Sequence, residues 1–192
     1  MHHDIMYEPA DIIIYVPGKG IVLREKSVMA FQKNDGKIVA FGTEAAQLAG
    51  KGMDNIVVMS PLRQGRIEDF AVAAQLFSML ITKALGKKPI LKQTMVICVP
   101  TAITPVEKKV IEDVMKYAGA GEVMISEEPA EKFVQESYEK FPGECRKVKL
   151  IVGITKDEPE RYVEEALKRI LTYAGQEQIS QERVCELLQK LL

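Results

Sequence analysis

Short apolar runs separated by glycine and proline turns occupy the first third of the chain. Residues 11–16 form a β-branched run, and the turn at 17–20 leads into further apolar positions within 21–31. The hairpin turn Asn34-Asp35-Gly36 is followed by a second apolar run at 37–41. Strands bounded by turns of this kind predict an antiparallel meander.

The next segment predicts a small lobe. Thr43 is suited to cap a short helix over residues 44–49, which the glycines after it end. Residues 55–59 predict one more short strand. Together with the preceding turn, these elements indicate a small lobe inserted at about residues 32–62.

From residue 68 the pattern changes to helices that alternate with buried strands. Residues 68–85 predict a long helix, and 95–99 is apolar throughout, as in a strand buried on both faces. Residues 104–107, Thr-Pro-Val-Glu, can form a capping box with proline at the first helical position. A strand at 122–126 and a helix after Pro129 follow. This βαβ order predicts parallel strands and, with the meander, a mixed α/β sheet with helices packed on it. The apolar stripe of the long helix consists of Phe70, Ala73, Leu76, Phe77, Leu80, Ile81 and Ala84.

The last quarter of the chain predicts one strand and two helices. The strand lies at 147–153, the first helix at 159–174, and Ser180 caps the last helix. We therefore divide the chain into a main domain of residues 1–143 and an extension of residues 144–192. The leucine-rich helices of the extension are suited to cover apolar surface of the main domain, because an α/β sheet must bury both faces.

Composition excludes several classes of protein. The chain has 192 residues and a net charge of −1, without the basic excess that sequence-independent nucleic-acid binding requires. Three widely spaced cysteines, two adjacent terminal histidines and no CxxC pair argue against disulfides, a zinc site and a catalytic histidine. The chain shows no signal peptide and no apolar run long enough to span a membrane, so a cytoplasmic protein is expected.

Three acidic residues are candidates for chemistry, although each also has a structural interpretation. Glu127 and Glu128 directly follow a predicted buried strand, where α/β folds place ligands and where a carboxylate could orient water. Asp69 opens the first long helix. All three are equally typical of helix N-termini, which favour acidic side chains, and the residues by themselves favour that interpretation. No phosphate-binding GxxxxGK[ST] motif occurs.

Read in order, three segments of the chain resemble one family. The segments are DIIIYVPGKGIVLREKSVMAF, IVVMSPLRQGRIEDF and VICVPTAITPVEKKVIEDVMKYAGAGEVMISEEPA. They resemble the MreB/Mbl family, the bacterial actin-like proteins that organise rod shape, over about residues 6–135. The resemblance implies one half of an actin-like (ribonuclease H-like) fold, with a mixed sheet and flanking helices.

The resemblance also implies a ligand, partners and site residues. Members of the family are ATPases, so the resemblance implies ATP and Mg²⁺ as ligands. It implies actin-like filament subunits or further copies of the chain as partners. Membrane contact is implied only by analogy with the family. Glu128 matches the family's water-orienting glutamate, as a remnant of a catalytic residue. Asp69 matches the acid that opens the first long helix, and we assign Asp69 and Glu127 to cofactor binding; no metal ligand is assigned.

The sequence departs from the family at the first phosphate loop. Met6 stands where the family has aspartate, Glu8 stands where it has glycine, and Pro9 and Ile12 replace hydroxyl residues. A phosphate loop needs small residues and free backbone N–H groups, so these replacements predict a loop that has lost phosphate binding. Phosphate binding would be retained only if the segment aligned with the family's loop in a shifted register, with Asp4 or Asp11 in contact with the metal.

The second phosphate loop, expected near residue 140, and the adenosine-binding half are not found in the sequence. We therefore expect the chain to have no ATPase activity. We expect it to be a non-catalytic partner or regulator of the cell-shape cytoskeleton. Two alternatives stay open at this point. One is a cytoskeletal ATPase that binds ATP–Mg weakly and polymerises. The other is an adaptor that reuses the fold outside cell shape.

Overall fold

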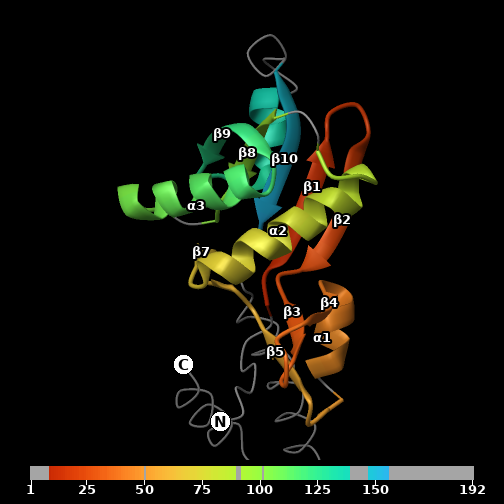
Figure 1. The fold of residues 1–192 in the computed structure, drawn as a ribbon. Coiled ribbons are helices and arrows are strands. Elements are labelled where there is room, and N and C mark those ends of the chain that lie inside the picture. The colour runs from red at the N-terminus through yellow and green to blue at the C-terminus, as the bar shows by residue number, and fades with distance from the viewer. Residues whose placement is uncertain (1–8, 50, 90–91, 101, 139–146, 156–192) are drawn as a thin grey trace, which may run out of the picture. The chain divides into compact units, whose positions relative to one another are not determined.

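The computed structural model describes residues 9–49, 51–89, 92–100, 102–138 and 147–155, all within one compact unit of the chain. A five-stranded sheet forms its centre, in the strand order β2-β1-β10-β8-β9 (Figure 1). The strands are β1 (Asp11–Val16), β2 (Gly20–Lys26), β8 (Gln93–Cys98), β9 (Ala120–Ser126) and β10 (Val148–Ile154). β1 pairs antiparallel with β2 and β10, whereas β8 pairs parallel with β9 and β10. The predicted mixed sheet is confirmed.

β10 occupies the middle of this sheet although it comes last among the described strands. Ile14 of β1 lies opposite Val152 on one side, and Ile97 of β8 lies beside Val152 on the other. The extension expected from residue 144 includes this strand, whereas the strand belongs to the main sheet. Its apolar run explains this place, because a central strand buries both faces. The helices predicted after residue 158 lie outside the described residues, so the division of the chain at residue 143 stays a prediction.

Two layers of side chains bury the faces of the sheet. On one face, α2 (Phe70–Leu85) and α3 (Pro105–Tyr117) pack over alternate strand residues such as Ile12, Leu150 and Ile97. On the other face, α4 (Ala130–Phe133) and η1 (Val134–Tyr138) pack over a smaller cluster around Val96 and Ile151.

The predicted glycine end of the long helix and the predicted capping box are confirmed, whereas two helix starts differ from the prediction: the long helix begins at Phe70, and Thr43 is the first residue of the short helix Thr43–Ala49 and not its cap. Asp69 caps α2 by accepting a hydrogen bond from the Val72 N–H at 2.9 Å, and Gly86 ends the helix in the left-handed conformation. α3 begins with the predicted capping box, in which Thr104 and Glu107 each accept from the other's backbone N–H. None of the helices among the described residues is long and apolar enough to span a bilayer.

A second, smaller sheet stands where the sequence indicated a lobe. It has the strand order β4-β3-β5, and α1 packs on one face of it. A short β6–β7 hairpin connects the lobe to α2. The elements are β3 (Met29–Gln32), β4 (Ile38–Phe41), α1 (Thr43–Ala49), β5 (Ile56–Met59), β6 (Leu62–Arg63) and β7 (Arg66–Ile67).

Glu25 joins the lobe to the main sheet. Its side chain is almost buried, accepts a hydrogen bond from the Thr43 N–H at 2.7 Å, and forms an ion pair with Lys83 of α2. A Cβ atom at Gly42 would collide with this carboxylate, and Gly42 also has a φ of +68°. Burial raises the pKa of Glu25, but the hydrogen bonds from Lys83 and Thr43 outweigh it and hold the pKa below its ordinary value. The charged form of Glu25 is therefore the form that the fold stabilises.

Glu25→Gln should destabilise the protein in a pH-dependent way. Because the folded pKa lies below the ordinary value of 4.5, the stabilisation is complete above that value and is lost as the pH falls through the folded pKa. We expect a loss of about 2 kcal/mol at neutral pH, measured by urea unfolding, and a smaller difference from the wild type in acid. The exposed Glu68→Gln serves as control; a difference that does not change with pH would contradict this account.

Gly153 of β10 allows α4 to approach the sheet closely. A Cβ atom built at Gly153 lies 2.5 Å from the Cβ of Ala130, nearer than side-chain atoms pack. Gly153→Ala should therefore cost about 1–3 kcal/mol of unfolding free energy, measured by urea denaturation. Adding Ala130→Gly removes the colliding atom, so the double variant should lose less stability than the two single variants added together. Strict additivity would show that the contact does not limit packing.

Candidate functional site

The carboxyl ends of the three parallel strands define the candidate site. Gly153 of β10, Cys98 of β8 and Ser126 of β9 lie at the same level in the sheet. The Val99 N–H donates to the Ser126 carbonyl at 2.8 Å, which keeps β8 and β9 together to their ends. Glu127 and Glu128 follow directly, so they stand at the edge where α/β sheets bind ligands.

Both glutamates are paired with lysines. Lys108 of α3 lies 3.4 Å from Glu127, and Lys132 of α4 lies 2.8 Å from Glu128. The hydrogen bond with Glu128 raises the pKa of Lys132, so this lysine keeps its charge. The Glu128 N–H also donates to the Ser126 Oγ at 3.3 Å. Neither carboxylate is left without a cation at this edge of the sheet.

The first turn of α3 connects this edge to the β6–β7 hairpin. Arg66 of β7 lies 3.3 Å from Glu107, the residue that precedes Lys108. Hydrogen bonds from Thr104 lower the pKa of Glu107, and the charge of Arg66 adds to the effect. Acidic and basic side chains therefore alternate from the hairpin to the end of β9.

Asp69 serves as the cap of α2. One carboxylate oxygen is used by the Val72 N–H, and the Asp69 N–H points to the Pro61 carbonyl at 3.4 Å. Among the described residues, no hydrogen bond or ion pair joins Asp69 to Glu127 or Glu128. Glu127 and Glu128 are consecutive in the sequence and pair with lysines of different helices, and the roles of all three acids stay predictions.

Asp11 is fully engaged in the sheet. Its N–H donates to Thr155 Oγ1 at 2.9 Å, and its carbonyl accepts from the Thr155 N–H at 2.9 Å. Its carboxylate lies 2.9 Å from Lys26 and 3.8 Å from Arg24. Asp11 is therefore held as the first residue of a paired strand.

This arrangement does not fit a phosphate cradle in the described part of the segment. Pro9 has no N–H to offer an anion, and the Asp11 N–H is already used. Asp4, Met6 and Glu8, as well as the region near residue 140, lie outside the described residues. Within the described part of the chain, no three His, Cys, Asp or Glu side chains are grouped to hold a metal.

The lysine partners of the two glutamates and the inert Cys98 are not among the candidate residues of the sequence. The Glu128–Lys132 pair has i,i+4 spacing, which the sequence could have revealed, whereas the Lys108–Glu127 pair depends on tertiary packing. Cys98 ends β8 and is buried; burial and then the nearby carboxylates of Glu131 and Glu128 raise its pKa to about 12. This thiol is therefore not a nucleophile at neutral pH.

Known proteins match this fold and this site segment. A sequence model of the family described as MreB/Mbl protein matches residues 6–134. The cell shape-determining protein Mbl of Bacillus subtilis is 40% identical over 148 residues, which cover 77% of this chain and 44% of that protein. The cell shape-determining protein MreB of Escherichia coli is 34% identical over 126 residues, covering 62% of this chain and 36% of that protein.

Solved structures agree with the sequence matches. The crystal structure of MreB5 of Spiroplasma citri bound to ADP superimposes with a TM-score of 0.56 and 28% identity, covering 65% of this chain and 37% of that one. The AMPPNP-bound structure of the same protein gives a TM-score of 0.56 and 30% identity. This chain spans less than half the length of the curated relatives named above. The match from residue 6 to residue 134, together with the mixed sheet and its flanking helices, establishes that the chain belongs to the actin-like MreB/Mbl family.

Proposed function

We propose that this chain is a non-catalytic partner or regulator in the bacterial cell-shape cytoskeleton. It acts in the cytoplasm by binding actin-like filament subunits, or further copies of itself, through its surface. The observation that carries the proposal is the state of Asp11, whose backbone groups are both bonded to Thr155 and whose carboxylate is paired with Lys26. The described end of the segment that the family resemblance aligns with a phosphate loop, from Pro9 onward, leads into β1.

Catalysis of phosphoryl transfer depends on positioning and on stabilising charge around the transferred phosphate. Glu128 cannot supply this alone, because a water-orienting carboxylate needs a bound phosphate to act on. Its ion pair with Lys132 gives it a structural function at the start of α4 instead. The chain thus retains the strands and helices of the family. The described contacts of Glu127 and Glu128 are ion pairs with lysines of neighbouring helices, which favour a structural role.

The small lobe offers a contact surface for another subunit. β4 and β5 are the two edge strands of its sheet, and edge strands present unpaired backbone groups to neighbours. Val39 of β4 is 47% exposed and Val57 of β5 is 40% exposed. Apolar side chains on exposed edges support binding by this lobe.

Nucleotide binding separates the proposal from a weak cytoskeletal ATPase. We expect calorimetric titration with ATP and Mg²⁺ to show no micromolar binding, and phosphate release to stay at background. Glu128→Gln should leave both results unchanged, because no phosphate is bound for this carboxylate to act on. Micromolar binding, or phosphate release that Glu128→Gln abolishes, would favour the ATPase instead.

Sedimentation with a full-length relative tests the partner role. Addition of this chain to polymerising Bacillus subtilis Mbl should change the amount of sedimented filament. Val39→Lys, which places a charge on the lobe edge, should reduce that change several-fold. Val106→Lys is a matched control, because Val106 is 73% exposed on α3, away from the lobe. If the wild-type chain has no effect on sedimentation, the adaptor alternative gains support and the cytoskeletal role is contradicted.

A further inference from the structure

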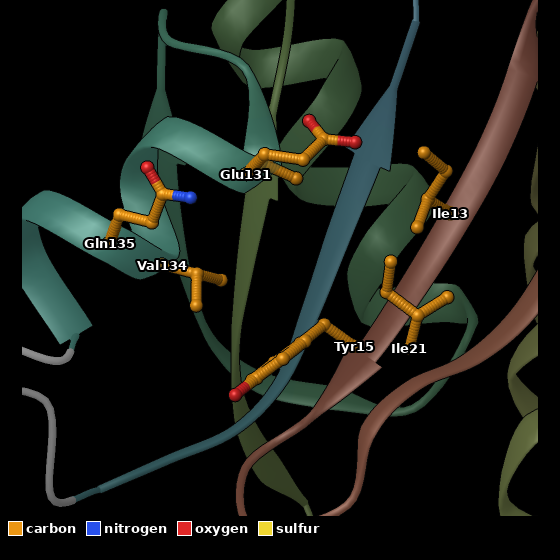
Figure 2. A pocket seen from close by; sticks show the side chains of 7 residues that line it. Ile13, Tyr15, Ile21, Glu131, Val134 and Gln135 are labelled. Carbon is orange, nitrogen blue, oxygen red and sulfur yellow. The ribbon is translucent and has the colours of Figure 1, made fainter.

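A small cavity opens beside α4 and η1, on the face of the main sheet opposite α2 (Figure 2). Its volume is about 170 Å³. A cavity of about 150 Å³ holds one benzene molecule, whereas sites for drug-sized ligands take about 300 Å³ or more. The cavity therefore fits one apolar side chain and is too small for a nucleotide. Its lining residues are Ile13, Tyr15, Ile21, Ala130, Glu131, Val134 and Gln135.

The lining is apolar on both sides of the cavity. Ile13 and Tyr15 project from β1 on one side, and Val134 projects from η1 toward them on the other (Figure 2). Ile21, at the start of β2, extends this surface and is 52% exposed. α4 itself packs on β10 and β8, so the cavity lies on its β1 side. Further apolar area would be buried if a second helix packed there beside α4.

The rim of the cavity carries an acidic group without a partner in the described part of the chain. Glu131 is exposed, and its carboxylate lies at the edge of the cavity on the side of Ile13 (Figure 2). Its neighbours Glu128 and Glu136 both lie within ion-pair distance of Lys132, whereas Glu131 forms no ion pair among the described residues. Gln135 adds an amide to the same rim. A positive charge on a ligand is therefore the complement of this rim.

We propose that this cavity is a docking site for a basic amphipathic helix of a partner protein. The helix inserts one large apolar side chain between Val134 and Tyr15, and it presents lysine or arginine to Glu131. The cavity has room for one side chain, so the partner helix has a single apolar anchor. The unpaired carboxylate of Glu131 is negative, so the charge that the helix presents to it is positive. This site is separate from the strand edge of Glu127 and Glu128, and it does not depend on the proposed function.

The test uses two synthetic helices of about 20 residues, above the length of about 12–15 residues at which isolated helices are marginal in water. One is built of leucine and lysine, and the other has glutamate in place of every lysine. Fluorescence anisotropy with the full chain should show that the basic peptide binds at least fivefold more tightly than the acidic one. Glu131→Gln should weaken binding of the basic peptide about three- to fivefold, and Ile21→Lys should weaken it at least tenfold.

Glu136→Gln is the matched control, because it removes an exposed carboxylate one turn away without touching the cavity. It should leave the affinity for the basic peptide unchanged, and circular dichroism should show each variant folded like the wild type. Equal binding of the two peptides, or equal effects of Glu131→Gln and Glu136→Gln, would overturn the proposal. It would also be overturned if the chain self-associates in sedimentation and Ile21→Lys abolishes that association, because the occupant would then be a second copy.

Discussion

The pairing of β10 with β1 on one side and β8 on the other holds the main sheet together. Without β10, the sheet would fall into two ribbons, β2–β1 and β8–β9, and an isolated two-stranded ribbon is marginally stable at best. β10 also contributes to both apolar layers, since Leu150 and Val152 face α2 and α3 while Ile151 faces α4. β10 therefore joins the two halves of the main sheet and takes part in the packing on both of its faces.

The same strand explains why the start of β1 is so constrained. Where β10 ends, Thr155 bonds to both backbone groups of Asp11. The lysine and arginine of β2 then neutralise the Asp11 carboxylate. A backbone that is bonded in this way gains stability by giving up the free N–H groups with which loops of this fold family could receive an anion. Both backbone groups of Asp11 are therefore already used by bonds within the sheet.

Local signals in the sequence predicted much of the fold. The capping box at Thr104 and the glycine that ends α2 depend on neighbours within one or two turns of chain, and the βαβ order is visible as an alternation of apolar runs and helical patterns. The place of β10 could not be predicted, because its apolar run indicates burial on both faces but does not identify the two strands that pair with it.

The same limit applies at the site. The i,i+4 pair of Glu128 and Lys132 is visible in the sequence, whereas the contact of Lys108 with Glu127 requires the packing of α3 against β9. The cavity beside Val134 joins side chains from separate elements, so no single segment reveals it.

The central place of a late strand also has a consequence for synthesis on the ribosome. Residues 11–126 contain the other four strands of the main sheet, and these emerge before β10 does. Until then, β1 and β8 each carry an unpaired inner edge, and such edges readily join other chains. The β2–β1 and β8–β9 pairs can therefore form before β10 is synthesised, whereas the contacts between β1 and β10, which join residues far apart in the chain, can form only afterwards. A molecular chaperone that shields exposed strands during this interval would act on the step that completes the domain.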